Sequence, residues 1–280
     1  MLMFIGSMLI FGTIGIFRRL IPLPSAFIAL VRGLLGGFFL LTFVKLKGKS
    51  TGEKLSPRQF IGLAVTGAVM GFNWILLIEA YNHTTVAAAT LCYYMQPTIV
   101  LLLSPFLFGE KLTARKTACA VIAVIGMVLV SGVTESGGMQ SGDPKGIVLG
   151  LGAALFYAFV VIMNKKLGGI EAYQKTIIQL ISAGAVMIPY LLLTGGFGSL
   201  TFSGLTIALL IVVGIVHTGF AYALYFGSMD GLKAQTIAIL SYIDPVSALL
   251  FSVVLLREPL SPAGLAGAVM IIGSAIVSEL

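Results

Sequence analysis

Hydrophobic residues in this chain come in long runs, and polar residues come in short clusters between them. The runs are close to the roughly 20 residues that a helix needs to cross the hydrocarbon core of a bilayer. The pattern therefore predicts an all-α polytopic membrane protein with ten transmembrane helices. The predicted spans are 2–17, 25–44, 59–81, 86–108, 114–132, 146–163, 171–193, 203–228, 233–256 and 261–278.

One stretch of the chain occurs twice. Residues 84–113 read TTVAAATLCYYMQPTIVLLLSPFLFGEKLT, and residues 232–261 read LKAQTIAILSYIDPVSALLFSVVLLREPLS. In each copy aromatic residues precede a polar residue and a proline, and a glutamate follows that proline by 13 residues. Such self-similarity indicates a duplicated unit. We assign the two five-helix repeats to residues 1–135 and 146–280, joined by a linker at 136–145.

Because five is an odd number, the second repeat should enter the membrane inverted relative to the first. Cytoplasmic loops normally hold an excess of lysine and arginine. With a cytoplasmic N-terminus, 12 of the 17 basic residues fall on the cytoplasmic side and four on the outside. This distribution indicates that both termini are cytoplasmic, and we expect the plasma (inner) membrane of a bacterium or archaeon as the location. An inverted repeat is typical of secondary transporters. The 12 basic residues are Lys45, Lys47, Lys49, Lys54, Arg58, Lys111, Arg115, Lys116, Lys165, Lys166, Lys175 and Lys233.

The composition supports a membrane protein and disfavours several other classes. Of the 280 residues, 58% are hydrophobic and 10% are charged, whereas soluble domains have about 25% charged residues. The net charge of +7 comes mostly from the cytoplasmic loops, so no nucleic-acid partner is expected. Cys92 and Cys119 lie inside apolar runs, which disfavours a disulfide framework or a zinc site. The motifs GxxxxGK[ST] and HExxH do not occur, so we expect neither an ATP-driven pump nor an enzyme, and no cofactor or metal.

The duplicated P-x₁₂-E-x-L-[TS] hairpin, together with the run Ala221-Tyr222-Ala223-Leu224-Tyr225, resembles the EamA family of the drug/metabolite transporter superfamily. The resemblance covers essentially the whole chain. It implies ten helices, alternating access, a central cavity and peripheral positions for the fifth and tenth spans. It does not fix the substrate, because members carry amino acids, other metabolites, quaternary amines or nucleotide-linked compounds. Asp244 breaks the internal symmetry, since Gln96 occupies the matching position of the first repeat.

Asp244 is the strongest candidate for a functional charge, because ionisable groups inside a membrane are costly. It lies near the middle of the ninth span, before Pro245, which frees a backbone carbonyl and can kink the helix. We interpret Asp244 as a cation or proton site; the alternative is a structural carboxylate bonded to a neighbouring helix. His217 should lie at a similar depth, where a His–Asp pair could couple proton movement to transport. The alternative for His217 is a neutral side chain bonded to a backbone carbonyl.

Arg32 and Glu79 are predicted near the same end of the second and third spans. They could form a buried ion pair, for which we favour a structural over a gating role. Without this pair, Glu79 becomes a second candidate for recognising a cation. Glu110 and Glu258 are expected to fix the hairpin turns rather than contact substrate.

Aromatic side chains near a carboxylate suit an ammonium or quaternary amine through cation–π attraction. Alternatively, tyrosine and tryptophan form the interfacial belt, which fits Tyr81 and Tyr190 better than residues close to the central prolines. Glycine pairs spaced four apart, such as Gly67 and Gly71, are interpreted as helix-packing positions. The candidate substrate-binding residues are Asp244, Glu79, Trp74, Tyr93, Tyr94, Gln96, Tyr157, Gln179, Tyr222 and Tyr242, with Tyr225 as a further aromatic candidate.

The sequence therefore predicts a secondary-active transporter of a small polar metabolite that works by alternating access. A cationic or zwitterionic substrate, such as an amino acid or quaternary amine, is favoured, and proton coupling at Asp244 and His217 is an open hypothesis. The alternative is a passive facilitator or channel-like pore. The expected partners are the substrate and the lipid bilayer, and either a monomer or a homodimer is compatible with an internally duplicated chain.

Overall fold

The computed structural model describes residues 1–46, 54–84, 86–130, 144–198, 200–229, 231–256 and 261–279, and every regular element within these ranges is a helix. Seven helices there are long and apolar enough to cross a membrane, and the shorter helices Leu2–Phe17 and Pro262–Val277 are also apolar. The structure is therefore that of a polytopic helical membrane protein, while the count of ten spans stays a prediction. The seven long helices are Ser25–Leu46, Pro57–His83, Ala89–Phe108, Pro144–Lys166, Ala172–Thr194, Gly204–Met229 and Ala234–Leu255.

Several of these helices consist of shorter segments separated by a turn or a change of helix type. The elements in chain order are α1 (Leu2–Gly12), α2 (Ile14–Leu20), α3 (Ser25–Leu46), α4 (Pro57–His83), α5 (Val86–Tyr93), α6 (Gln96–Phe108), α7 (Ala114–Val130), α8 (Pro144–Lys166), α9 (Ala172–Thr194), α10 (Gly204–Gly214), the π-helix η2 (Ile215–Phe220), α11 (Ala221–Met229), α12 (Ala234–Leu240), α13 (Ile243–Leu256) and α14 (Pro262–Glu279).

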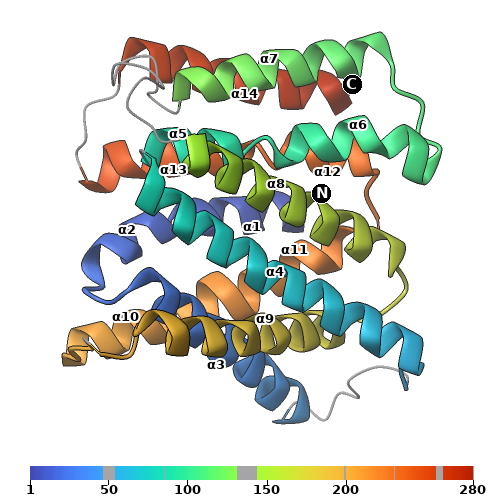
Figure 1. The fold of residues 1–280 in the computed structure, drawn as a ribbon. Helices are drawn as coiled ribbons and strands as arrows, with labels where there is room; N and C mark the ends of the chain where they lie inside the picture. The colour runs from blue at the N-terminus through green and yellow to red at the C-terminus, as the bar shows by residue number, and fades with distance from the viewer. Residues whose placement is uncertain are drawn as a thin grey trace.

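The helices α7 and α14 pack against each other at one edge of the bundle, and α3, α9 and α10 lie at the opposite edge (Figure 1). The elements α1, α4, α8 and α11 lie between these edges. Because α7 and α14 correspond to the fifth and tenth predicted spans, the peripheral position expected for those spans is confirmed.

Loops that are distant in sequence meet at the two ends of the bundle. At one end Phe43 of α3 packs near Tyr173 of α9, with ring centroids 6.2 Å apart. The same end contains the C-termini of α3, α6 and α8 and the N-termini of α4, α9 and α12, where most of the 12 basic residues counted above occur. We call it the lysine-rich end. At the opposite end, Phe27 of α3 packs near Phe197, with ring centroids 6.2 Å apart.

Glycines bring the long helices into close contact. A Cβ atom on Gly67 of α4 would lie 2.4 Å from the carbonyl oxygen of Gln179 in α9, and one on Gly71 would lie 2.7 Å from that of Ala183. Such distances are shorter than a van der Waals contact, so only glycine fits the backbone approach at these positions. The interpretation of the spaced glycines as packing positions is confirmed.

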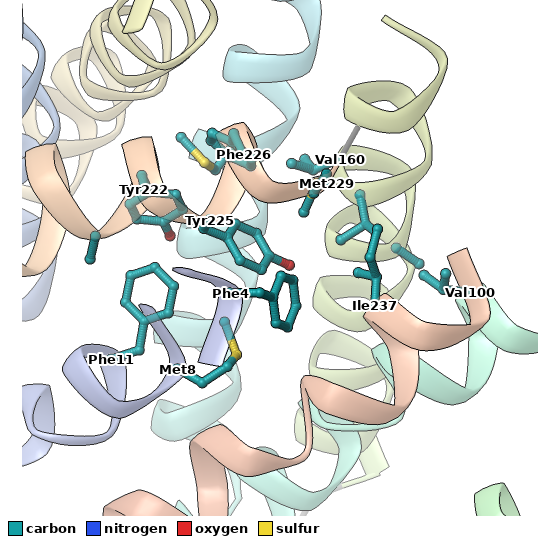
Figure 2. Packing of buried hydrophobic residues seen from close by; sticks show 14 of the residues in the cluster. Phe4, Met8, Phe11, Val100, Val160, Tyr222, Tyr225, Phe226, Met229 and Ile237 are labelled. Carbon is teal, nitrogen blue, oxygen red and sulfur yellow. The ribbon is translucent and has the colours of Figure 1, made fainter. Parts of the chain in front are cut away.

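The centre of the bundle is aromatic. Tyr225 of α11 is fully buried between Phe4 and Phe11 of α1 and its neighbour Phe226, as Figure 2 shows. The outer surface, in contrast, exposes large apolar side chains such as Leu193 and Phe106, which are 88% and 85% exposed. A hydrophobic exterior around a packed interior is the arrangement that a lipid solvent requires.

Candidate functional site

Two membrane-spanning helices are interrupted at equivalent positions. Helix α5 ends at Tyr93 and α6 begins at Gln96, while α12 ends at Leu240 and α13 begins at Ile243. Each interruption therefore falls next to a polar-residue–proline pair, Gln96-Pro97 or Asp244-Pro245. Proline has no N–H group for the helical hydrogen-bond pattern. The sequence analysis noted that Pro245 can kink its helix. In the structure one helical segment ends at Leu240, shortly before Pro245, and another ends at Tyr93, shortly before Pro97.

The two breaks are bonded to each other across the bundle. The hydroxyl of Tyr94, in the first break, donates to Oδ2 of Asp244 at 3.2 Å. The hydroxyl of Tyr242, in the second break, shares a hydrogen bond of 2.6 Å with Oγ1 of Thr98 in α6. Tyr94 and Tyr242 are equivalent residues of the sequence repeat. Each break thus places a tyrosine against the helix that follows the other break.

Asp244 is half-buried in the first turn of α13. A helix N-terminus presents free N–H groups and partial positive charge, which favours a carboxylate at this position. The side chain that donates to Asp244, Tyr94, is a neutral donor. Within the described residues the Asp244 carboxyl group is not paired with a basic side chain, which leaves it available to a ligand.

Tyrosines from three helices surround this carboxylate. The rings of Tyr93 and Tyr157 are stacked at 8° with centroids 5.5 Å apart, and the Tyr157 hydroxyl donates to that of Tyr225 at 3.2 Å. Tyr94, which donates to Asp244, has its ring 5.7 Å from that of Tyr93. The rings of Tyr225 and Tyr222 are 6.3 Å apart, which connects Tyr222 to the same group. The structure therefore brings together most of the aromatic residues selected from the sequence. We call Tyr93, Tyr94, Tyr157, Tyr222 and Tyr225 the tyrosine cluster.

Gln96 and Gln179, the two amide candidates, occupy different surroundings. Gln96 begins α6 at the first break; it is 2% exposed, and its Nε2 atom has no hydrogen-bond partner in the described structure. Gln179 is fully buried between helices, where its Nε2 donates to Oδ1 of Asn164 in α8 at 3.1 Å. Gln179 therefore belongs to a polar contact between α8 and α9, whereas Gln96 lies beside the Asp244 site.

Lys175 is a buried residue that sequence reasoning placed among the cytoplasmic loop cations. It is fully buried in the first part of α9, and its Nζ donates to the carbonyl oxygen of Asn164 at 3.2 Å. Its position inside the predicted span 171–193 was the signal that could have revealed this. Lys175 and Gln179 both bind Asn164, so they form one buried polar cluster.

The predicted ion pair between Arg32 and Glu79 is not formed. Arg32 donates from Nε to Oγ1 of Thr218 at 3.0 Å, and its guanidinium lies 5.1 Å from the centre of the Trp74 ring. Glu79 instead accepts from the hydroxyl of Tyr190 in α9 and from Nδ2 of Asn82. The reason is the direction in which the side chains leave α4. Trp74, which contacts Arg32, and Glu79 are five residues apart, which corresponds to a rotation of about 140° around the helix axis. Glu79 therefore faces α9, and Arg32 lies on the other side of the helix.

His217 and Asp244 are likewise not in contact. His217 lies in the π-helical segment η2, and its Nε2 shares a hydrogen bond of 2.7 Å with Oγ1 of Thr13. Its ring packs 4.5 Å from that of Phe17, and Nδ1 has no partner in the described structure. His217 is thus turned towards α1 and α2, and the structure does not assemble the hypothesised His–Asp pair.

Glu110 joins the two halves of the chain at the lysine-rich end. Its carboxylate oxygens accept the backbone N–H groups of Ala234 at 2.8 Å and Gln235 at 3.1 Å, which caps the start of α12. The Gln235 side chain also donates to Oγ of Ser104 in α6 at 3.0 Å. Glu110 therefore makes a structural contact, but with the start of α12 in the other half of the chain and not within its own hairpin turn. Glu258, its counterpart, lies outside the described residues.

The substitution Glu110→Ala should lower the stability of the folded protein without removing any group of the tyrosine cluster. Loss of a helix cap costs about 0.5–2 kcal/mol, here by leaving two N–H groups of α12 without their acceptor. The measurement is the thermal unfolding midpoint in detergent, with Lys111→Ala as the control because Lys111 is an exposed neighbour in the same turn. Equal midpoints for the two variants would contradict the capping role.

The fold and the site define a class: a multi-pass integral membrane protein with a carboxylate and tyrosines where two of its helices are interrupted. A family model described as the EamA-like transporter family matches residues 1–132 and again residues 144–279. The chain belongs to the EamA-like transporter family.

Proteins of similar sequence are either named as transporters or have names that state no function. The chain is 33% identical to the "Uncharacterized transporter YxxF" of Bacillus subtilis over 248 residues, which cover 89% of this chain and 79% of that protein. It is 27% identical to "Protein PecM" of Dickeya dadantii, with 90% of this chain and 82% of that protein covered. A solved crystal structure superposes with a TM-score of 0.85 at 20% identity, over 99% of this chain and 95% of the other, which establishes the shared fold.

Proposed function

We propose that this chain is a secondary-active transporter that carries a small cationic or zwitterionic metabolite by alternating access. The observation that carries the proposal is Asp244 at the break of its helix, half-buried and bonded to Tyr94 within the tyrosine cluster. A carboxylate attracts an ammonium group by charge, and the faces of tyrosine rings add cation–π attraction. Transporter sites are typically built at mid-membrane from such discontinuous helices.

The proposal includes ten spans arranged as two inverted five-helix repeats, with both termini in the cytoplasm. Three observations support it: the family model matches the chain twice, the helix breaks occur at equivalent positions, and Tyr94 and Tyr242 make reciprocal contacts. At one matching position the two halves differ in charge, Asp244 against Gln96, which gives the pathway one charged side and one neutral side.

Alternating access requires one closed end and one end through which the substrate enters. At the lysine-rich end, Glu110 binds the start of α12 and Lys165 donates to the carbonyl of Leu232. At the opposite end, a cavity of about 290 Å³ lies beside Arg32 and Trp74. The contacts of Glu110 and Lys165 support a state that is closed at the lysine-rich end, with the cavity beside Arg32 as the candidate entrance. Rocking of one half against the other would release Glu110 and open the path to the cytoplasm.

The test is substrate counterflow in proteoliposomes. Amino acids and quaternary amines are first screened by thermal shift, since a ligand at a hundred times its Kd adds about 2.7 kcal/mol to stability. Vesicles preloaded with an unlabelled hit are then diluted into the labelled compound. A carrier should accumulate label transiently, because unlabelled substrate that leaves the vesicle brings the binding site to the outside, where labelled substrate binds. The initial rate of uptake should also saturate as the concentration of labelled substrate rises. Uptake that rises linearly with concentration and ignores the preload would instead indicate a passive pore.

A further inference from the structure

The cavity at the opposite end of the bundle contains an arginine in largely apolar surroundings. Its volume is about 290 Å³, and it is lined by parts of α2, α3, α4 and α10. The α4 residues Trp74, Leu77, Ile78 and Tyr81 line it, a spacing that places them on one face of the helix. Arg32 of α3 lies about 10 Å along the helix axis from the start of α3, and so reaches well into the bundle from this end.

The guanidinium of Arg32 is held in position but is not neutralised. Thr218 fixes Nε, and because its own hydroxyl donates to the carbonyl of Val213 at 2.9 Å, its oxygen faces Arg32 as an acceptor. The Trp74 ring packs against the guanidinium group, with Cζ of Arg32 5.1 Å from the ring centroid. In the described part of the chain, Nε is the one guanidinium nitrogen with a protein hydrogen-bond partner, which leaves the two terminal NH₂ groups as donors.

Carboxylates of the described residues do not compensate this charge. Glu79 is engaged by Tyr190 and Asn82, and Asp244 by Tyr94. A charge inside a membrane protein is costly unless it is paired, and the rigid fork of arginine matches a planar carboxylate with two parallel hydrogen bonds. An arginine that is positioned, half-buried and without a counterion is therefore suited to an anionic group that arrives with a ligand.

We propose that Arg32, supported by Thr218 and Trp74, binds the carboxylate of the transported molecule. The inference rests on the proposed function and narrows it: the substrate carries both an ammonium and a carboxylate, as an amino acid does, rather than a positive charge alone. Tyr222 links the two sites, because it lies within hydrogen-bonding reach of Trp74, which contacts Arg32, and its ring is 6.3 Å from that of Tyr225 in the tyrosine cluster. The carboxylate subsite lies in the entrance cavity, and the ammonium site at the helix breaks.

The experiment compares each proteinogenic L-amino acid with its decarboxylated amine, for example leucine with 3-methylbutylamine, by thermal shift on the full chain in detergent. Wild type should bind at least one amino acid about tenfold to a hundredfold more tightly than its amine, the size expected for hydrogen bonds to a charged group. Arg32→Gln should abolish this preference while leaving the affinity for the amine unchanged. Arg32→Lys should restore part of it, because lysine keeps the charge but not the fork.

The amine serves as the internal folding control, and Arg58→Gln, at an exposed site of the lysine-rich end, is the matched charge control. Equal binding of amino acids and amines by wild type, or an equal loss of both in Arg32→Gln, would overturn the carboxylate subsite while leaving the ammonium site standing. Absence of stabilisation by any ammonium compound would instead overturn the proposed function, and the subsite with it. The two failures are therefore distinguishable.

Discussion

Replacing Asp244 with asparagine should reduce transport of an ammonium-bearing substrate by about thirtyfold or more. The charge–charge attraction is lost, while the side-chain shape is kept and the amide oxygen can still accept the hydrogen bond from Tyr94. Removing one charged partner of a desolvated ion pair typically costs about 2–5 kcal/mol, which corresponds to roughly thirtyfold to several thousandfold in affinity. The measurement is initial uptake into proteoliposomes, with the thermal unfolding midpoint of the purified variant as the folding check.

The matched control is Glu79→Gln. Glu79 is also a half-buried carboxylate within a long apolar helix, but it is bonded to Tyr190 and Asn82 rather than to the tyrosine cluster. Its neutralisation should leave transport within a few-fold of wild type. If Asp244→Asn folds normally and transports like wild type, Asp244 has no part in the mechanism. A loss of the same size in both variants would point to a general effect of helix charge instead of a defined cation site.

The helix breaks and the residues around them could be predicted because their signals are local. Pro97 and Pro245 mark the interruptions directly, and the repeat makes each copy evidence for the other. Tyr93, Tyr94 and Tyr242 are close to those prolines in sequence, so their presence at the site followed from proximity. The peripheral positions of α7 and α14 followed from the family resemblance.

The contacts of Arg32, Glu79 and His217 could not be predicted, because they depend on the rotation of each helix about its axis. In a soluble helix the polar stripe reports that rotation. Here apolar residues face both lipid and core, so the stripe is nearly absent. Glu79 was expected to reach Arg32 because both lie near the same end of their spans, yet it is turned towards Tyr190.

The π-helical segment η2 adds a second source of error. A π-helix changes the angle between successive side chains, so the direction of His217 could not be read from α-helical periodicity. The same segment places Thr218 where it accepts from Arg32. This one irregular segment thus holds both His217 and Thr218, the hydrogen-bond partner of Arg32, and the apolar pattern around it gave no sign of its presence.

The substitution Gly67→Ala should destabilise the protein although alanine is the better helix former. A Cβ atom at this position would lie 2.4 Å from the carbonyl oxygen of Gln179 and 2.6 Å from its Cα. Both are backbone atoms of α9, so no side-chain rotation relieves the clash, and α4 and α9 must move apart. Overpacking of this kind costs about 1–3 kcal/mol and occasionally more. The displacement would also strain the buried contact between Gln179 and Asn164.

Gly273→Ala is the matched control, because Gly273 lies inside α14 and a Cβ there has no neighbouring atom within 4 Å. At this open position alanine should be neutral or stabilising by up to about 1 kcal/mol through helix propensity. The unfolding midpoints of the two variants in the same detergent should therefore shift in opposite directions, or Gly67→Ala alone should fall. If both variants match or exceed wild type, the close approach of α4 to α9 at Gly67 is not needed for stability. A fall in Gly67→Ala alone would show that backbone contact between these helices limits which side chains the bundle accepts.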